Sequence, residues 1–497
     1  MIATPATAQA GLPRACLLEP RDLIVGRWEK PTRTLQEWLV DPASGEPLQQ
    51  QVTTAPADVD RAIAAAWRAH LAHPDGIGTP EQRIEALHLA AELIAVQAEA
   101  IAVQDSINSG VPISITRLFA QSLADTFRAA AGHVPDLAQR DLTRGGRPVH
   151  LHRLPLGPAA VLAPWNAPTA VTAKKAAYAW AAGCPVIVKP SPWSPNGTRL
   201  LVEAMAAAAE TVGLAPPSVQ LVHGSVDVGQ QLAGDLRVRA LSFTGSRTGG
   251  RAVAAAAADD LKALQLELGS NNPALVLDDA DPASTATALA AGMLKLNGAW
   301  CESPGTVYVP AGMLQSLVTA LRSELARIRP GPPLDPAATF GPQSNPAQHA
   351  GLTARLDGLR RAGARVVTVG EVPEGGLWVA PTLVLDAPEE LTRDELFGPV
   401  LVLRPYTDLD LALLAVHELR TGLAAYVFTT SISRGQRIGR LLPAGEVKVN
   451  GTSLLDMSPD SAQSFWYGSG IGGHGDRALA MFFTGIRIVG EDVDSVL

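Results

Sequence analysis

The sequence predicts an α/β protein whose first part is a doubly wound parallel sheet. Short apolar runs, typical of buried strands, alternate with helical patterns between residues 157 and 243, and this alternation indicates strands joined by crossover helices. The alternation begins again at Pro282, which predicts a second α/β domain. A chain of 497 residues is long enough for about three domains.

Composition excludes several classes of protein. Apolar residues make up 47% of the chain and charged residues 18%, which favours large buried cores over disorder. The net charge is −8 and no lysine- or arginine-rich run is present, so nucleic acid is not an expected partner. The cysteines Cys16, Cys184 and Cys301 form neither a disulfide framework nor a metal-ligand pattern, and they predict a reducing compartment and no metal site.

The sequence also predicts where the protein resides. Residues 1–18 lack a basic start and a continuous apolar core, so no secretion signal is expected. No run of about eighteen apolar residues is present, and prolines and charges interrupt the alanine-rich stretch around Lys174 and Lys175. We therefore expect a soluble, cytoplasmic protein that does not bind membranes.

The N-terminal part predicts short strands followed by helices. Apolar residues at helical spacing follow Asp58 and Asp60, which the helix dipole favours in a first turn. Residues 108–110, Asn-Ser-Gly, predict the end of a long amphipathic helix, and Pro112 is tolerated in the first turn of the next helix. The expected strands are 22–28 and 34–40, and the expected helices are 58–70, 80–105 and 112–132.

The central part predicts the sheet itself. Residues 147–154 alternate polar and apolar side chains, as an exposed strand does. The expected buried strands are 157–163, 185–190, 219–222 and 240–243, and the expected helices are 174–182, 196–212 and a helix-like run at 251–266. This order is typical of dinucleotide-binding sheets.

The second half predicts a similar unit and a terminal strand. The expected strands are 272–277, 306–309, 364–369 and 379–385, and the expected helices are 282–296, 313–328 and 352–362. Residues 485–490 predict a last strand that has no obvious partner nearby in the sequence. We expect it to pair with residues 147–154 of a neighbouring subunit.

A carboxylate and a lone thiol stand at the rims of predicted strands. Glu267 precedes the strand 272–277, and Cys301 lies in a glycine-punctuated turn before the strand 306–309. This placement suggests a base and a nucleophile that face one pocket. The alternative is that Cys301 is a buried, inert thiol, which the apolar context favours for Cys184, and that Glu267 is a surface acid.

Two glycine-rich stretches are candidates for a phosphate site. Residues 243–250, Phe-Thr-Gly-Ser-Arg-Thr-Gly-Gly, lie between a predicted strand and a helix, whose N-terminal N–H groups would face a pyrophosphate. An ordinary glycine turn is the alternative. Residues 470–475 match G-x-G-x-x-G letter by letter, but the chain ends at residue 497, before the ~30-residue strand–helix–strand unit could be completed. We reject residues 470–475 as the phosphate site.

A set of motifs, in this order and at this spacing, resembles the aldehyde dehydrogenase superfamily over nearly the whole chain. The motifs are Pro164-Trp165-Asn166, Lys189-Pro190-Ser191, Phe243-Thr244-Gly245-Ser246, Glu267-Leu268-Gly269, Cys301, Glu395-Leu396-Phe397-Gly398-Pro399-Val400 and Ser469-Gly470-Ile471-Gly472. The resemblance implies an α/β, aldehyde dehydrogenase-like fold with three parts. These are a doubly wound cofactor domain (1–138 and 158–266), an α/β catalytic domain (267–474) and a small β bridging or oligomerisation element (139–157 and 475–497).

The resemblance also implies the chemistry. Cys301 would attack an aldehyde carbon as a thiolate, and the amide of Asn166 with the backbone N–H of Cys301 would hold the oxyanion. Hydride would then leave for the nicotinamide, and Glu267 would activate water to hydrolyse the thioester to a carboxylic acid. Lys175 matches a lysine that the family places close to this centre.

The same resemblance implies the residues that bind NAD or NADP. Lys189 would bind the adenosine ribose, Gly245 and Ser246 would lie by the pyrophosphate, and Glu395 would hold the nicotinamide ribose. The remaining implied cofactor residues are Trp165, Ser191, Gly249, Leu268 and Phe397.

Some positions depart from the family pattern. Pro192 stands where the family often has a glutamate that binds the ribose hydroxyls. Loss of that carboxylate removes a repulsion against a 2′-phosphate, so NADP is as plausible as NAD. Ser270 and Asn271 replace a glycine and a lysine, Thr306 replaces an arginine, and residues 465–468 replace a Pro-Phe-Gly-Gly stretch.

The expected function is NAD(P)-dependent oxidation of an aldehyde to a carboxylic acid by a homodimer or homotetramer. Trp300, Phe465, Trp466 and Tyr467 favour an aromatic or medium-chain aldehyde, with ordinary core packing as the alternative. One rival function is a CoA-acylating relative, against which Glu267 argues because such enzymes generally lack that base. The other is a catalytically silent member kept as a binding or structural protein.

Overall fold

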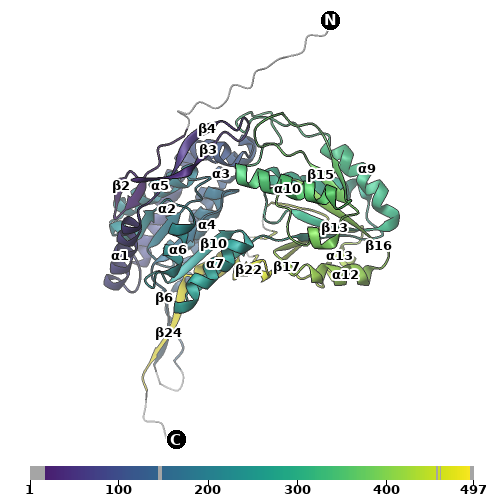
Figure 1. Cartoon of the computed structure of the whole chain (residues 1–497). Coiled ribbons are helices and arrows are strands. Elements are labelled where there is room, and N and C mark those ends of the chain that lie inside the picture. Colours follow the sequence, from purple (N-terminus) through teal and green to yellow (C-terminus); the bar gives the residue numbers. More distant parts are fainter. Residues whose placement is uncertain (1–16, 144–147, 455–456, 459–460, 493–497) are drawn as a thin grey trace.

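The computed structural model describes residues 17–143, 148–454, 457–458 and 461–492. Two α/β halves lie side by side, and an arm that contains β6 and β24 projects from the first half (Figure 1). Cys16, Arg147 and most of the stretch 1–18 lie outside the described residues, so the expectations about them stay predictions.

Within the described residues, the first half is built on an eight-stranded sheet in the order β2-β1-β9-β8-β7-β10-β11-β22. The strands from β9 to β11 run parallel, whereas β1 and β22 join them antiparallel. The bounds are β1 Asp22–Ile24, β2 Arg27–Glu29, β7 Ala159–Leu162, β8 Val186–Lys189, β9 Val219–Leu221, β10 Ala240–Gly245, β11 Ala263–Leu268 and β22 Gly470–Ile471. The parallel core predicted from the alternation is confirmed.

Helices cover both faces of this sheet, as in a doubly wound fold. Val186 and Val188 of β8 pack with side chains of α2, α4 and α5 on one face, and Ile187 packs with α1 and α6 on the other. This alternation is what a strand buried on both faces requires. The helices are α1 Pro56–Ala72, α2 Pro80–Ser109, α3 Ile113–His133, α4 Pro168–Ala181, α5 Asn196–Thr211, α6 Val226–Gly234 and α7 Arg247–Ala257.

The 30-residue helix α2 has clear boundaries and a buried face. Thr79 forms a capping box with Gln82, and Gly110 ends the helix in the left-handed conformation at φ 76. By length and composition, α2 is the one helix among the described residues that could cross a membrane, which the sequence did not predict. Its side chains enter the core shared with α3 and α5, and buried Asp105 accepts a hydrogen bond from Thr169 at 2.7 Å, so length and composition alone do not make it a membrane span.

The second half is built on a seven-stranded sheet in the order β14-β15-β16-β13-β12-β18-β19, in which only β14 is antiparallel to its neighbour within the described residues. Its strands are β12 Asn272–Val276, β13 Pro304–Pro310, β14 Arg365–Thr368, β15 Thr382–Leu385, β16 Val400–Tyr406, β18 Ala424–Phe428 and β19 Glu446–Val449. Its helices include α8 Pro282–Leu294, α9 Leu314–Leu325, α10 Pro346–Arg361, α12 Leu409–Glu418 and α13 Ile432–Gly439. The strands and helices of this half that follow Leu385 were not predicted from the sequence.

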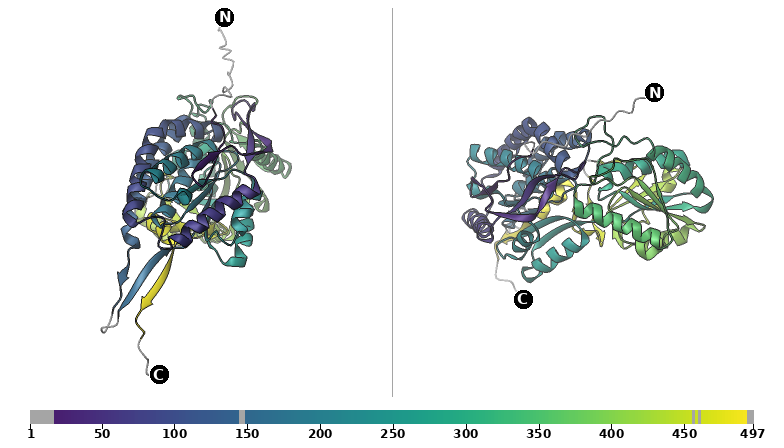
Figure 2. Two further views of the ribbon diagram at one scale, coloured as in Figure 1. Left: turned by 90° about the vertical axis from the view of Figure 1, so that its left-hand side faces the viewer. Right: turned by 45° about the horizontal axis from the view of Figure 1, so that its top comes forward.

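The projecting arm corrects one prediction. β24 (Thr484–Gly490) pairs antiparallel with β6 (Val149–Pro155) of the same chain, and β6 also pairs with β5 (Arg140–Asp141). The expectation that the terminal strand pairs with a neighbouring subunit is wrong, because α14 (Asp476–Phe482) packs on α3 and α4 and returns the chain to β6. Figure 2 shows that the arm stands clear of both halves.

Residues 251–266 correct a second prediction, because they do not form one helix. α7 ends at Ala257, Leu261 turns the chain in the left-handed conformation at φ 47, and β11 follows. The alanine-rich composition favours a continued helix, but pairing of β11 with β10 overrides that propensity. Glu267 therefore lies in a strand instead of following a helix.

Candidate active site

The two sheets meet where the chain passes from β11 to β12. Only residues 269–271 separate Leu268, the last residue of β11, from Asn272, the first residue of β12. Thr244 of β10 lies opposite Glu267 of β11, so both side chains stand at the carboxyl edge of the first sheet. Ligand sites of doubly wound sheets lie at this edge.

The loop before Cys301 is held in an unusual backbone conformation. Within the 3₁₀ turn Lys295–Gly298, three successive residues, 296–298, have positive φ angles of 49°, 57° and 83°. The side chain of Asn297 stabilises this turn by donating to the carbonyls of Gly110 and Pro342, each at 2.9 Å. Left-handed backbone of this kind persists only where its surroundings fix it.

A second asparagine fixes the cysteine itself. Asn272 donates from Nδ2 to the carbonyls of Cys301 at 2.9 Å and Ser303 at 2.8 Å. Its Oδ1 accepts from the backbone N–H of Ala424 at 3.0 Å, so every polar atom of the amide has a partner. The half-buried Cys301 is thereby held at the amino edge of the second sheet, facing β11.

The carboxylate of Glu267 lies between the thiol and a group of donors. The distance from Cys301 Sγ to Glu267 Oε1 is 3.6 Å. The other oxygen, Oε2, lies 3.3 Å from Thr244 Oγ1, 3.6 Å from Lys175 Nζ and 3.1 Å from His474 Nε2. Glu267 and Lys175 are both buried, so these charges interact with little screening by water.

The charges in this cluster perturb one another. Burial alone would raise the pKa of Glu267, but His474 and then Lys175 outweigh burial and hold it well below its usual range. Burial lowers the pKa of Lys175 to about 8 although Glu267 opposes the change. Burial, and after it the charge of Glu267, raises the pKa of the Cys301 thiol well above its ordinary value. Such shifts are typical of functional sites.

Asn166 lies on the other side of the cysteine loop. It stands between β7 and α4, and its Nδ2 donates to the carbonyl of Ala299 at 2.7 Å. An amide nitrogen has two N–H donors, so one remains beyond this bond. The structure therefore brings Asn166, Lys175, Glu267 and the Cys301 loop together.

His474 is a site residue that the sequence reasoning missed. It belongs to β23 (Gly473–His474), inside the G-x-G-x-x-G match that was rejected as a phosphate site. A titratable residue in a glycine-rich stretch after the Ser-Gly-Ile-Gly motif was the signal that could have found it.

Glycines within residues 470–475 allow the backbone of other strands to approach closely. A Cβ added to Gly470 would lie 1.7 Å from the carbonyl oxygen of Leu266, and one added to Gly473 would lie 2.0 Å from that of Gln463. These contacts let β22 and β23 cross close to neighbouring strands and carry His474 to Glu267. Close packing against backbone therefore accounts for both glycines.

Several implied cofactor residues lie next to this centre. Glu395 is packed so tightly on Gly269 that a Cβ there would lie 2.2 Å from Oε2, and burial raises the pKa of this carboxyl to about 8. The rings of Trp165 and Phe397 meet edge to face with centroids 5.5 Å apart.

The remaining implied cofactor residues lie further along the same sheet edge. Ser246 caps α7 by accepting from the N–H of Gly249 at 3.1 Å, and Leu268 packs on Gly250. Lys189 and Ser191 lie at the end of β8, two strands from β10 in the sheet. The structure does not bring Lys189 or Ser191 to Cys301. The full set of implied cofactor residues is Trp165, Lys189, Ser191, Gly245, Ser246, Gly249, Leu268, Glu395 and Phe397.

These residues fit a dinucleotide such as NAD or NADP. The N-terminus of α7 has no acidic residue in its first turn, so no carboxylate of that turn opposes a pyrophosphate. Burial lowers the pKa of the Lys189 ammonium to about 8, and its Nζ donates to the carbonyl of Pro190 at 3.2 Å. Buried, perturbed groups of opposite sign at one sheet edge are typical of ligand sites.

Polar side chains at two positions that depart from the family pattern, Asn271 and Thr306, have hydrogen-bond partners within the protein. Thr306 Oγ1 donates to Asn271 Oδ1 at 3.1 Å, and Asn271 Nδ2 donates to the carbonyl of Thr392 at 2.8 Å. Of the four aromatic residues considered for a substrate tunnel, Trp300 and Phe465 are buried, whereas Trp466 and Tyr467 are exposed on β21 (Trp466–Tyr467). No group of three or more His, Cys, Asp or Glu side chains that could hold a metal ion occurs among the described residues.

Comparison with known proteins identifies the family. The sequence matches the aldehyde dehydrogenase family over residues 28–489. It is 32% identical to a betaine aldehyde dehydrogenase of Cereibacter sphaeroides, over 91% of this chain and 92% of that relative.

Solved structures give the same result. HpcC from Thermus thermophilus superimposes with a TM-score of 0.88 at 28% identity and covers 97% of this chain and 96% of its own. An NAD⁺ complex of an aldehyde dehydrogenase from Bacillus cereus has a TM-score of 0.89 at 23% identity, covers 97% of this chain and 98% of its own, and shows likeness of fold alone. The predicted resemblance and fold class are confirmed, and the expectation of NAD or NADP as cofactor is supported. The chain belongs to the aldehyde dehydrogenase family.

Proposed function

We propose that this protein oxidises an aldehyde to a carboxylic acid through covalent intermediates on Cys301, with NAD or NADP as the oxidant. The observation that carries the proposal is the contact of Cys301 Sγ with Glu267 Oε1 at 3.6 Å, while Lys175 lies 3.6 Å from the opposite oxygen. A nucleophile, a base and a cation that orients the base are thus assembled in one buried site.

In the first half-reaction Cys301 is the nucleophile. Its thiol loses its proton to solvent, and the thiolate, which the nearby Lys175 ammonium favours, attacks the aldehyde carbon to form a thiohemiacetal. The remaining N–H of the Asn166 amide and the backbone N–H of Cys301 hold the oxyanion, a stabilisation of about 3–4 kcal/mol per donor. A bound NAD or NADP would supply the hydride acceptor, and loss of hydride from the thiohemiacetal carbon would leave a thioester on Cys301.

In the second half-reaction Glu267 is the base. It removes a proton from the water that attacks the thioester carbon, the carbon–sulfur bond breaks, and the carboxylic acid leaves as the thiol is restored. Lys175 and Thr244 hold the carboxylate in place for this step. The balance is aldehyde, oxidised cofactor and water giving carboxylic acid, reduced cofactor and a proton.

The adenosine end of the site supports use of NADP as well as NAD. Lys189 would hold the ribose, and Pro192, three residues further along the chain, has no carboxylate to repel a 2′-phosphate. We expect measurable activity with both cofactors. An NAD preference of about a thousandfold in kcat/KM, ~4 kcal/mol in transition-state terms, would contradict this.

The surroundings of Cys301 favour an uncharged, apolar substrate, aromatic or of medium length. Ile115, Phe119 and Leu454 pack in one apolar cluster with Cys301 and Trp300. Lys295 Nζ lies 4.4 Å and Lys448 Nζ 5.8 Å from the centroid of the Trp300 ring. Because two ammonium groups already lie near that ring, a quaternary ammonium aldehyde, such as the betaine aldehyde for which the Cereibacter relative is named, would compete with them for it.

One experiment tests these statements together. Purified protein is mixed with benzaldehyde, hexanal or betaine aldehyde and with NAD or NADP, and reduced nicotinamide is followed by absorbance with and without CoA. We expect kcat/KM for benzaldehyde or hexanal to exceed that for betaine aldehyde by roughly tenfold or more, without CoA dependence. A required CoA would favour the acylating alternative, and no reduction with any aldehyde would favour a silent binding protein.

The assembly and location are also part of the proposal. β24 exposes Ile486, Ile488 and Val489 on the projecting arm, which suits a homodimer or homotetramer in a cytoplasmic enzyme. Light scattering of the parent and of Ile488→Asp should give a larger mass for the parent. A monomeric parent would contradict the assembly.

A further inference from the structure

We propose that His474 is a positioning residue that orients the Glu267 carboxylate for hydrolysis of the thioester. The inference rests on the proposed function and adds to it a residue from the C-terminal part of the chain. It is carried by the contact of His474 Nε2 with Glu267 Oε2 at 3.1 Å, the shortest of the three donor contacts that the structure gives this oxygen.

The hydrogen-bonding roles of the imidazole follow from its neighbours. Lys175 Nζ lies 3.4 Å from His474 Nδ1, and an ammonium can only donate. Nδ1 must therefore accept, which leaves Nε2–H to donate to Glu267 Oε2. The tautomer is assigned from this hydrogen-bond network. Each of Lys175, His474 and Glu267 contacts the other two.

The imidazole is itself held in place. The edge-to-face contact of the Phe465 and His474 rings has a centroid distance of 4.9 Å and an interplanar angle of 86°. β23 pairs with β20 (Gln463–Ser464), with His474 opposite Gln463. A positioning residue must be more rigid than the group it orients, and these contacts supply that rigidity.

His474 has its effect because the two oxygens of the Glu267 carboxylate have different partners. Oε2 is engaged by Thr244, Lys175 and His474, while Oε1 faces Cys301 Sγ. Loss of the closest donor lets the carboxylate rotate towards Lys175, away from the thioester that forms on Cys301. A displacement of about 1 Å can cost roughly 100-fold in rate.

Charges from every side bear on the pH dependence of this step. Lys175 faces Glu267 from α4, with the Lys174–Asp476 ion pair near it. Cys301 faces Glu267 from the loop before β13, with Glu302 and Glu395 around the thiol. Both His474 and Lys175 favour the ionised carboxylate, so removal of the imidazole moves the acid limb of hydrolysis to higher pH.

The test compares His474→Leu, His474→Gln and the control His88→Gln, a substitution of an exposed histidine on α2. Each protein is mixed with benzaldehyde and NADP in a stopped-flow instrument. The burst of reduced nicotinamide reports hydride transfer, and the later steady rate reports hydrolysis. We expect His474→Leu to keep the burst rate within about threefold and to lose roughly 10- to 100-fold in the steady rate.

Glutamine should restore part of the loss, because its Nε2–H can reach Glu267 as the imidazole does. The acid limb of the steady rate should lie at higher pH in His474→Leu than in the parent, with His88→Gln unchanged. A burst and a steady rate that fall in equal proportion, or a steady rate like that of the parent in both His474 variants, would overturn the inference. If thermal melting shows that His474→Leu is unfolded, the comparison of His474→Gln with the parent decides in the same way.

Failure of the proposed function gives a different result. In that case the parent itself shows no burst with any aldehyde, whatever residue 474 is. A normal parent with unaffected His474 variants overturns only the role of His474.

Discussion

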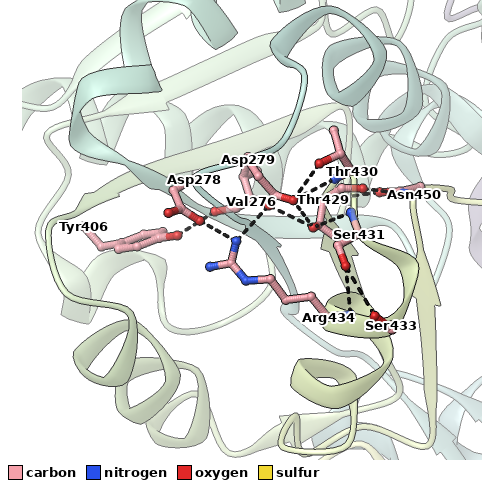
Figure 3. Close-up of polar contacts among 10 residues, drawn as sticks. All are labelled: Val276, Asp278, Asp279, Tyr406, Thr429, Thr430, Ser431, Ser433, Arg434 and Asn450. Carbon is pink, nitrogen blue, oxygen red and sulfur yellow. Dashed lines mark hydrogen bonds and ion pairs between the residues drawn. The ribbon is translucent and has the colours of Figure 1, made fainter.

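Two carboxylates at strand ends of this molecule look alike in sequence and differ in structure. Glu267 lies near the end of β11 in the first sheet, and Asp279 follows β12 in the second. Asp279 accepts from Thr429 Oγ1 at 2.8 Å, Thr430 Oγ1 at 2.7 Å and Arg434 at 2.9 Å (Figure 3). These bonds tie the end of β12 to the start of α13.

Glu267 is buried more deeply and bonded less tightly. Its side chain is 5% exposed and that of Asp279 is 29% exposed, yet the contacts of Glu267 lie between 3.1 and 3.6 Å. Hydrogen bonds, first that of Thr430, lower the pKa of Asp279 to about 2, whereas the contacts with His474 and Lys175 hold the pKa of Glu267 below its usual range against the effect of burial. The comparison teaches that a carboxylate whose oxygens are engaged by short hydrogen bonds serves to hold a strand and a helix together. A carboxylate with longer contacts and one oxygen facing a thiol is available for chemistry.

The largest effect expected on the Glu267 side is that of Cys301→Ala. Without the thiol no covalent intermediate forms, so aldehyde oxidation should fall to the background rate, while reduced nicotinamide still binds in a fluorescence titration. The control is Cys184→Ala, since Cys184 is fully buried and its Sγ contacts the carbonyl of Phe483 at 3.4 Å. Turnover should persist in that variant; substantial turnover by Cys301→Ala would rule out the thioester route.

The next effect is that of Glu267→Gln, which keeps the size of the side chain and removes the base. Mixing with aldehyde and cofactor should give up to one equivalent of reduced nicotinamide per site, followed by turnover slowed roughly 10²- to 10⁴-fold. Mass spectrometry of the quenched protein should find the acyl group on the Cys301 peptide. Absence of any burst would mean that Glu267 activates the thiol, and turnover like the parent would restore the CoA-acylating alternative.

On the other side of the comparison, Asp279→Asn should lower stability and leave catalysis intact. Loss of the charged acceptor should cost roughly 1–3 kcal/mol in the free energy of unfolding at neutral pH. The pKa of Asp279 is lower in the folded protein than its ordinary value, so its contribution is complete above about pH 4 and is lost as the pH falls towards 2. Melting curves of parent and variant should therefore converge as the pH falls through this range, and an unchanged gap would contradict the assignment.

The contrast also marks what the sequence could predict. The positions of Cys301, Glu267 and Asn166 follow from motifs, and the parallel sheets follow from the alternation of strands and helices. His474 did not follow, because its proximity to Glu267 depends on β22 crossing back to pair with β11, a contact over some two hundred residues of chain. The pairing of β24 with β6 depends on the same return of the chain, which periodicity does not encode.

The smallest effects come from a matched pair of threonines and test the comparison most directly. Thr430→Val removes a 2.7 Å bond to Asp279, and Thr244→Val removes a 3.3 Å bond to Glu267. We expect Thr430→Val to lower the free energy of unfolding by about 1 kcal/mol with an unchanged kcat. Thr244→Val should change stability by less than about 0.5 kcal/mol, because His474 and Lys175 still engage Glu267, and should slow the steady rate by roughly two- to fivefold. Urea unfolding and steady-state kinetics give, for each of the two variants, a change in the free energy of unfolding and a change in kcat. The comparison fails if both variants lose equal stability, or if Thr430→Val lowers kcat as much as Thr244→Val does. In that case the length and number of hydrogen bonds do not distinguish the structural carboxylate of Asp279 from the reactive carboxylate of Glu267.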